Sequence, residues 1–146
     1  MLNRILKSLV KVLPFCLKWY YNEKRLRESL LIKLGDKGIR IVNGATLISC
    51  HFEVTNHLPF PVSIDRLEAK LNLTGYIENG VKLMPILVGE NSTQYYPLDI
   101  SVSERNEQNL NSIELKNNHL QVDCYLVTKI RNLTKTEYYS SFKVTK

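Results

Sequence analysis

Residues 47–56 read Leu-Ile-Ser-Cys-His-Phe-Glu-Val-Thr-Asn, so apolar and polar side chains alternate along the segment. Successive side chains of a β-strand point to opposite faces of its sheet. The alternation therefore predicts a strand with one face buried and the other in water. Cys50 and Phe52 are expected to face the core, and Ser49 and His51 are expected to face solvent.

The same alternation recurs along the rest of the chain. It is clear in residues 67–74, 96–102 and 120–126, and weaker in residues 81–88 and 137–144. Residues 30–34 and 39–42 flank Gly35-Asp36-Lys37-Gly38, and these glycines predict a tight turn and therefore a hairpin. Further turns are predicted at Gly75, Asn79-Gly80, Gly89 with Asn91, and Asn117-Asn118. Seven or eight short strands with this spacing predict an all-β fold, an antiparallel β-sandwich.

A polar segment, residues 103–118, interrupts the series of strands. It carries Leu110 and Ile113 at helical spacing. We therefore expect either a short helix that covers one end of the sandwich or a loop.

Charge is concentrated at the N-terminus. The chain has 146 residues, of which 44% are hydrophobic and 23% are charged, a composition typical of one globular domain. Residues 1–33 hold eight of the 20 basic and two of the 14 acidic residues, so they carry the entire formal net charge of +6. The sequence predicts a basic helical arm, residues 1–29, joined to a sandwich domain, residues 30–146, which is neutral from residue 34 onward. A domain that binds nucleic acid through its own surface would instead be basic itself.

The start of the arm is amphipathic. On a helical wheel the apolar residues of the first 13 fall in one arc and the polar residues fill the other side. Such a helix can lie in a bilayer interface, with its cations near anionic headgroups. The predicted membrane contacts are the apolar Leu2, Ile5, Leu6, Leu9, Val10 and Leu13, the cationic Arg4, Lys7, Lys11 and Lys18, and the aromatic Trp19. No charge-free stretch of the arm exceeds residues 12–17, whereas about 20 apolar residues are needed to span a bilayer.

Other interpretations of the arm stay open. The same apolar stripe could pack on the sandwich or on a second copy of the chain, and the lack of acids before Glu23 also suits a targeting peptide. Pro14 is expected to end or kink the first helix. An aromatic cluster follows, close to basic residues, and suits either a headgroup boundary or the rim of a core; it consists of Phe15, Trp19, Tyr20 and Tyr21 beside Lys18, Lys24 and Arg25.

Residues 52–75 carry a family resemblance. A strand ends in Asn56, a proline-containing turn follows, and an alternating strand leads to Gly75. Asparagine can cap a strand end with its own side chain, and proline stiffens the turn. This pattern resembles the water-stress (WHy) domain of late embryogenesis abundant proteins, although His57 and Leu58 interrupt the Asn-Pro-Asn of that family. The residues that carry the motif are Asn56, Pro59, Phe60, Pro61, Ile64, Leu67, Leu71 and Gly75.

The resemblance covers about residues 30–144 and has consequences for function. It implies a non-enzymatic sandwich domain of the fibronectin III or immunoglobulin kind, linked in the family to stress protection and sometimes anchored to membranes. It supplies no catalytic residues.

The residues themselves indicate no chemistry. The histidines His51, His57 and His119 are isolated, and neither they nor the three cysteines have the spacing of a metal or redox motif. Phosphate-binding glycine motifs and hydrolase motifs are also missing. We expect no enzyme activity, no cofactor, no metal and no small-molecule substrate. Cys50 and Cys124 are both expected to face inward, as free thiols or, in an oxidising compartment, as a disulfide.

Three functions remain as hypotheses. The first is a membrane-peripheral binding or scaffolding protein at the cytoplasmic face, whose arm docks on an anionic membrane while the sandwich presents a surface to a protein partner. The second is a soluble, cytoplasmic stress-protection or interaction module, whose N-terminal helix is structural or forms a homo-oligomer. The third, disfavoured by the neutral domain, is nucleic-acid binding by the arm, with Trp19, Tyr20 and Tyr21 stacking on bases.

Overall fold

The structure is a computed structural model that describes residues 13–83, 85–112, 114–140 and 142–145. Residues 13–20 are helical, and we call them the arm helix. After it come α2 (Glu23–Glu28), β1 (Leu30–Val42), the short helix η1 (Asn43–Ala45), β2 (Leu47–Asn56), β3 (Val62–Leu73), β4 (Tyr76–Lys82), β5 (Ile86–Val88), β6 (Ser92–Ser101), α3 (Glu104–Ser112), β7 (His119–Val127), β8 (Asn132–Ser140) and β9 (Val144–Thr145).

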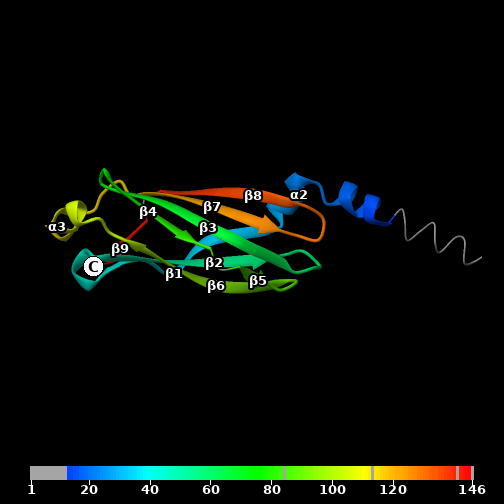
Figure 1. The fold of residues 1–146 in the computed structure, drawn as a ribbon, viewed down its shortest axis with the longest axis horizontal. Helices are drawn as coiled ribbons and strands as arrows, with labels where there is room; N and C mark the ends of the chain where they lie inside the picture. The colour runs from blue at the N-terminus through cyan, green and yellow to red at the C-terminus, as the bar shows by residue number, and fades with distance from the viewer. Residues whose placement is uncertain (1–12, 84, 113, 141, 146) are drawn as a thin grey trace, which may run out of the picture.

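The strands form two stacked sheets (Figure 1). One has the order β6-β2-β1-β9, and the other has the order β4-β3-β7-β8 with β5 also paired to β3. Each pairing is antiparallel except that of β1 with β9. The predicted all-β sandwich is confirmed. The described residues form nine strands rather than seven or eight, because residues 81–88 divide between β4 and β5 around Pro85 and β9 is separate from β8.

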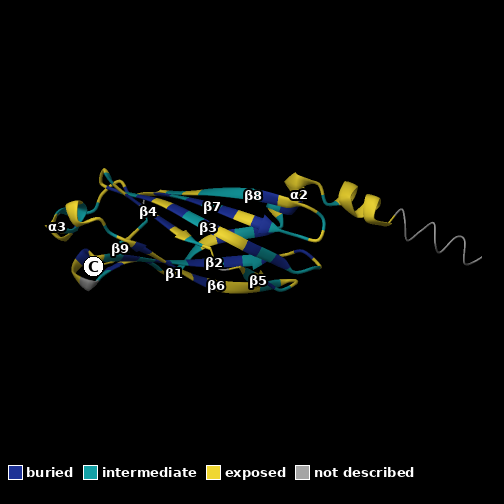
Figure 2. Ribbon diagram, viewed as in Figure 1, coloured by how far each residue is buried: buried dark blue, intermediate teal, exposed yellow. Residues whose placement is uncertain are grey.

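Buried residues alternate with more exposed ones along the strands (Figure 2), and the buried ones build the core between the sheets. In β2, residues 48, 50, 52 and 54 are buried, while the residues between them are half-buried. Phe52 is among the largest side chains with no exposure. Burial of one face of each strand removes apolar surface from water, at about 25 cal/mol per Å², and this is the main stabilising contribution to such a fold.

The predicted hairpin at residues 30–42 is wrong. These residues form the single strand β1, and both of its halves pair with β2 in the same direction. Leu34 pairs with Phe52 and Ile39 with Cys50, so residues 35–38 form a bulge rather than a reversal of the chain. Gly38 has a φ of 57°, which glycine adopts without a steric penalty.

The turn predicted at Asn79-Gly80 is also wrong, because both residues lie inside β4. The chain turns instead at Thr74 and Gly75, whose φ values are 53° and 94°. A Cβ at Gly80 would lie only 2.6 Å from Cγ1 of Ile100 in β6, in the opposite sheet. Glycine at position 80 therefore permits close approach between the sheets.

Helix α3 covers one end of the sandwich and buries Leu110. Of the two structures predicted for residues 103–118, a short helix and a loop, the helix is therefore the one that forms. Its N-terminus is held by Glu78, a residue of β4 that is only 8% exposed. Glu78 Oε1 accepts hydrogen bonds from Ser103 N, Ser103 Oγ and Asn106 Nδ2 at 2.8–3.0 Å. Ile113 lies outside the described residues.

Candidate functional site

The arm helix extends from one end of the sandwich, and every one of its residues is exposed (Figure 2). Phe15 and Trp19 are 73% and 77% exposed, and Leu13 and Leu17 are exposed as well. No helix within the described residues is long and apolar enough to cross a bilayer. Of the predicted membrane contacts, Leu13, Lys18 and Trp19 belong to this helix. The others, Leu2, Arg4, Ile5, Leu6, Lys7, Leu9, Val10 and Lys11, lie outside the described residues.

Aromatic contacts anchor the base of the arm helix. The ring of Tyr21 packs edge-on against Phe60 of the β2–β3 loop, with centroids 5.3 Å apart, and against Tyr20 at 4.9 Å. The guanidinium of Arg25 lies 4.0 Å from the centroid of the Tyr20 ring, and its Nη1 donates to Tyr20 O at 3.3 Å. Tyr21 is thus part of the rim of the core, whereas Phe15, Trp19 and Tyr20 are exposed.

The next helix, α2, joins the arm helix to the sandwich. The side chain of Asn22 caps its N-terminus by accepting from Arg25 N at 2.9 Å. Leu26 is fully buried in the core of the sandwich. The position of α2, and hence the start of the arm helix, is therefore set by burial of an apolar side chain.

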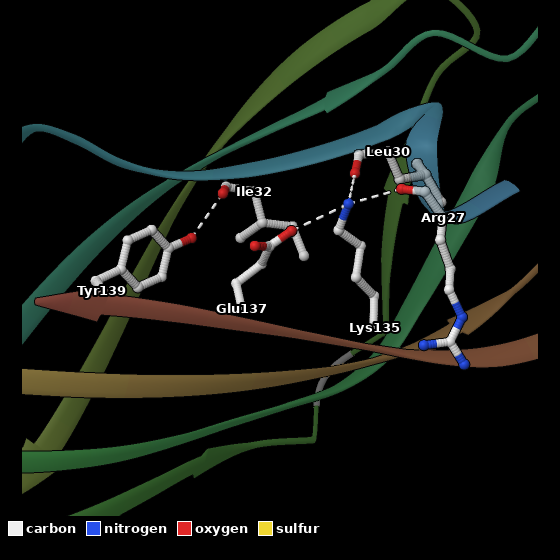
Figure 3. Close-up of polar contacts among 6 residues, drawn as sticks. All are labelled: Arg27, Leu30, Ile32, Lys135, Glu137 and Tyr139. Atoms are coloured by element: carbon white, nitrogen blue, oxygen red, sulfur yellow. Dashed lines mark hydrogen bonds and ion pairs between the residues drawn. The ribbon is translucent and has the colours of Figure 1, made fainter. Parts of the chain in front are cut away.

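A lysine of β8 fixes the other end of α2 (Figure 3). Lys135 Nζ donates to Arg27 O at 2.6 Å and to Leu30 O at 2.5 Å, and it forms an ion pair with Glu137 at 3.0 Å. Its side chain is only 11% exposed. Nearby, the hydroxyl of Tyr139 donates to Ile32 O at 2.6 Å. Strand β8 of one sheet is thereby joined to β1 of the other and to the last turn of α2.

The turn between β7 and β8 touches the arm helix. Arg131 Nη2 donates to Lys18 O at 3.4 Å. Thr128 holds the turn closed, because its Oγ1 accepts from Ile130 N and Arg131 N and donates to Arg131 O. Sequence reasoning missed this contact. The two partners are 113 positions apart, and periodicity reports only on neighbours within one element.

The motif residues support the β2–β3 and β5–β6 connections. Asn56 is fully buried, and its Nδ2 donates to Phe60 O and Gly89 O at 2.9 Å and to Val88 O at 3.3 Å. Its Oδ1 accepts from Leu58 N at 2.9 Å. Of the other motif residues, Ile64, Leu67 and Leu71 are buried, Phe60 and Pro61 are half-buried, and Pro59 and Gly75 are exposed.

One polar cluster on the outer face of β2 and β6 has the residue types of a hydrolase. Ser49 Oγ donates to Asp99 Oδ1 at 2.7 Å, and His51 Nε2 lies 3.5 Å from Ser49 Oγ. A nucleophilic serine instead donates to a histidine that a carboxylate orients. Here the serine proton is directed to the carboxylate, so the arrangement does not activate the hydroxyl.

The cysteines of the described residues are free thiols. Cys50 and Cys124 are buried, as their alternation predicts, and Cys16 is exposed. Burial raises the pKa of each buried thiol to about 12. Neither is a reactive thiolate near neutral pH.

Comparison with known proteins shows the fold. No family model and no curated protein matches this chain. A solution structure of a protein assigned provisionally to the late embryogenesis abundant proteins is similar, with a TM-score of 0.50 and 10% identity, over 95% of this chain and 86% of that one. The X-ray structure of a Northeast Structural Genomics Consortium target, SoR45, has a TM-score of 0.53 and 6% identity, over 77% of this chain and 84% of that one. The resemblance to late embryogenesis abundant proteins is therefore supported at the level of the fold.

Proposed function

We propose that this chain is a non-enzymatic protein that binds the surface of anionic membranes through its N-terminal arm, while its sandwich presents a surface to a protein partner. The observation that carries the proposal is the exposure of the arm helix. Four large side chains, those of Leu13, Phe15, Leu17 and Trp19, are more than 40% exposed on a helix that leaves the sandwich. Exposed apolar side chains next to one another are typical of an interaction surface.

Charge favours a membrane as the partner of this surface. The arm carries Arg4, Lys7, Lys11 and Lys18, and the first acidic residue is Glu23. Each cation near an anionic bilayer contributes about 1 kcal/mol, and burial of aromatic and aliphatic side chains among the headgroups adds to this. Trp19 beside Lys18 suits the headgroup boundary, where an amphipathic ring and a cation are both solvated favourably.

A soluble module with a dimerising arm is the second candidate. The same exposed side chains could pack on a second copy of the chain. Two arms that each carry four cations before their first acid would repel one another, so the dimer has an electrostatic cost that an anionic surface does not. For this reason we place the membrane first.

The test is flotation with vesicles of phosphatidylcholine, with and without phosphatidylserine, at low and high salt. The proteins compared are the full chain, a deletion of residues 1–20 that keeps Tyr21 on Phe60, and F15S/W19S. The matched control is Y95S/Y138S, which also removes two exposed aromatic rings, both 74% exposed, but from the sandwich.

We expect the full chain and the control to float only with phosphatidylserine and to release at high salt, and we expect the other two variants to stay at the bottom. Trp19 is the only tryptophan, so its emission should shift to shorter wavelength on addition of the anionic vesicles. If the full chain fails to float with anionic vesicles at low salt, or the deletion floats equally well, the proposal is wrong. A deletion that converts a dimer to a monomer without affecting flotation would favour the second candidate.

A further inference from the structure

The β7–β8 turn carries two cations, Lys129 and Arg131, and Arg131 contacts the arm helix. Lys129 and Arg131 are both exposed, and Ile130 between them is half-buried. The chain has no acidic residue from position 124 to position 136. Within the described residues neither cation takes part in an ion pair, whereas Lys24 and Arg27 of α2 are paired with Glu28 and Glu23. The turn therefore presents uncompensated positive charge.

From this placement we infer that the β7–β8 turn is a second membrane contact, through which Lys129 and Arg131 bind the same anionic bilayer as the arm. The inference rests on the proposed function. It adds a part of the sandwich to a surface that the sequence located in the arm alone. The sequence did not indicate this part because residues 34–146 carry no net charge, which conceals the local excess in the turn.

Geometry fixes how near the turn lies to that bilayer. Arg131 Nη2 is 3.4 Å from the backbone oxygen of Lys18, so the guanidinium lies within the envelope of the arm helix, whose radius with side chains is about 5–6 Å. It therefore lies within one helix diameter, about 10–12 Å, of a bilayer on which the arm helix rests. The screening length is about 8 Å at physiological salt and longer at low salt, so the attraction is weakened but not abolished at this distance.

The turn is also held in a defined shape. Thr128 Oγ1 accepts from Ile130 N at 3.2 Å and from Arg131 N at 3.1 Å, and Thr128 N donates to Arg131 O at 3.3 Å. Lys129 and Arg131 thus start from a fixed backbone, and little backbone entropy is lost when they bind. Contacts from both the arm helix and the turn would hold the sandwich at the surface, rather than leave it tethered by the arm.

The experiment compares vesicle partitioning of the full chain with that of K129E/R131E. Since each cation contributes about 1 kcal/mol, removal of two predicts about 30-fold weaker partitioning into phosphatidylserine vesicles at low salt. The matched control is R105E/K116E, which changes the net charge equally at two exposed positions of α3 and the segment after it. This control should weaken partitioning much less.

Two single variants separate charge from the contact with the arm. Among the described residues, Lys129 forms no hydrogen bond or ion pair with the arm helix, so K129E changes charge alone and should weaken partitioning about fivefold or more. R131Q removes the charge but keeps an N–H donor for Lys18 O, and should also weaken partitioning about fivefold. Thermal unfolding followed by circular dichroism verifies that each variant is folded.

The outcomes distinguish this inference from the proposed function. If the unaltered chain does not bind anionic vesicles, the proposed function fails. If the unaltered chain binds, the deletion of residues 1–20 does not, and K129E/R131E partitions like R105E/K116E, then the arm is the membrane contact and the inference about the turn is overturned.

Discussion

Replacement of Asn56 by alanine should destabilise the sandwich by about 3 kcal/mol. The fully buried side chain donates to Phe60 O and Gly89 O, approaches Val88 O, and accepts from Leu58 N. Three well-formed hydrogen bonds at 2.9 Å would be lost, and each contributes about 0.5–1.5 kcal/mol. Three such bonds sum to about 1.5–4.5 kcal/mol. Because Leu58 is itself buried, its N–H would be left without this acceptor, so we expect a loss near the middle of that range rather than at its lower end.

Replacement of Asn56 by aspartate tests the same geometry with a side chain of equal shape. A carboxylate still accepts from Leu58 N but cannot donate, so its negative charge would face three carbonyl oxygens in the interior. The folded state should therefore raise the pKa of this aspartate above the unfolded value of about 4. The folded protein then holds more protons than the unfolded one, and stability should fall as the pH rises above about 4.

The assay is urea unfolding of the two variants and the unaltered protein, followed by circular dichroism between pH 4 and pH 8. Asn72→Ala is the control, since Asn72 Oδ1 accepts one exposed hydrogen bond, from Gly75 N at 2.8 Å. It should cost about 1 kcal/mol or less. A loss below about 1 kcal/mol for N56A, or an N56D variant with no greater pH dependence than N56A, would refute this account of the buried amide.

Three further predictions follow from packing and burial. Gly80→Ala should lower the free energy of unfolding by about 1–3 kcal/mol, because the added Cβ would meet Ile100 Cγ1. In urea unfolding, G80A/I100A should lose less stability than the sum of the two single variants, and additive losses would contradict the close approach of the sheets. In the folded protein a thiol reagent should modify Cys16 quickly and reach Cys50 and Cys124 only on unfolding, so a second fast-reacting thiol would contradict their burial. Burial raises the pKa of Cys50 and Cys124 from 9.0, and that of Tyr96 from 10.0, to about 12. The unfolded chain therefore releases these protons at lower pH than the folded protein, and the free energy of unfolding should fall as pH rises from about 9 to about 12. Constant stability across that pH range would contradict the burial of these three groups.

The sequence predicted the features that depend on near neighbours. Alternation in residues 47–56 is a property of one strand, so its buried face could be assigned before its partners were known. The bulge at residues 35–38 could not be predicted in this way. A glycine-containing segment between two alternating runs suits a hairpin and a bulge equally, and only the pairing of both runs with β2 distinguishes the two.

Other features depend on contacts between distant segments. Gly80 resembles a turn glycine until Ile100 of the opposite sheet is placed against it. Arg131 resembles an ordinary surface cation until its contact with Lys18 is seen. In the candidate surface, the sequence indicated the arm, and the three-dimensional fold was needed to add the turn.

The bonds from β8 to β1 also bear on how the protein avoids aggregation. Among the described residues, β9 pairs with Ile39 and Arg40 alone, so the first part of β1 is an edge of the sheet that they form. An unpaired edge is a template on which another chain can add a strand. Here Lys135 and Tyr139 already occupy the carbonyls of Leu30 and Ile32. An incoming strand would have to displace an ion-paired ammonium and a phenol, so addition of a strand at Leu30 and Ile32 is opposed.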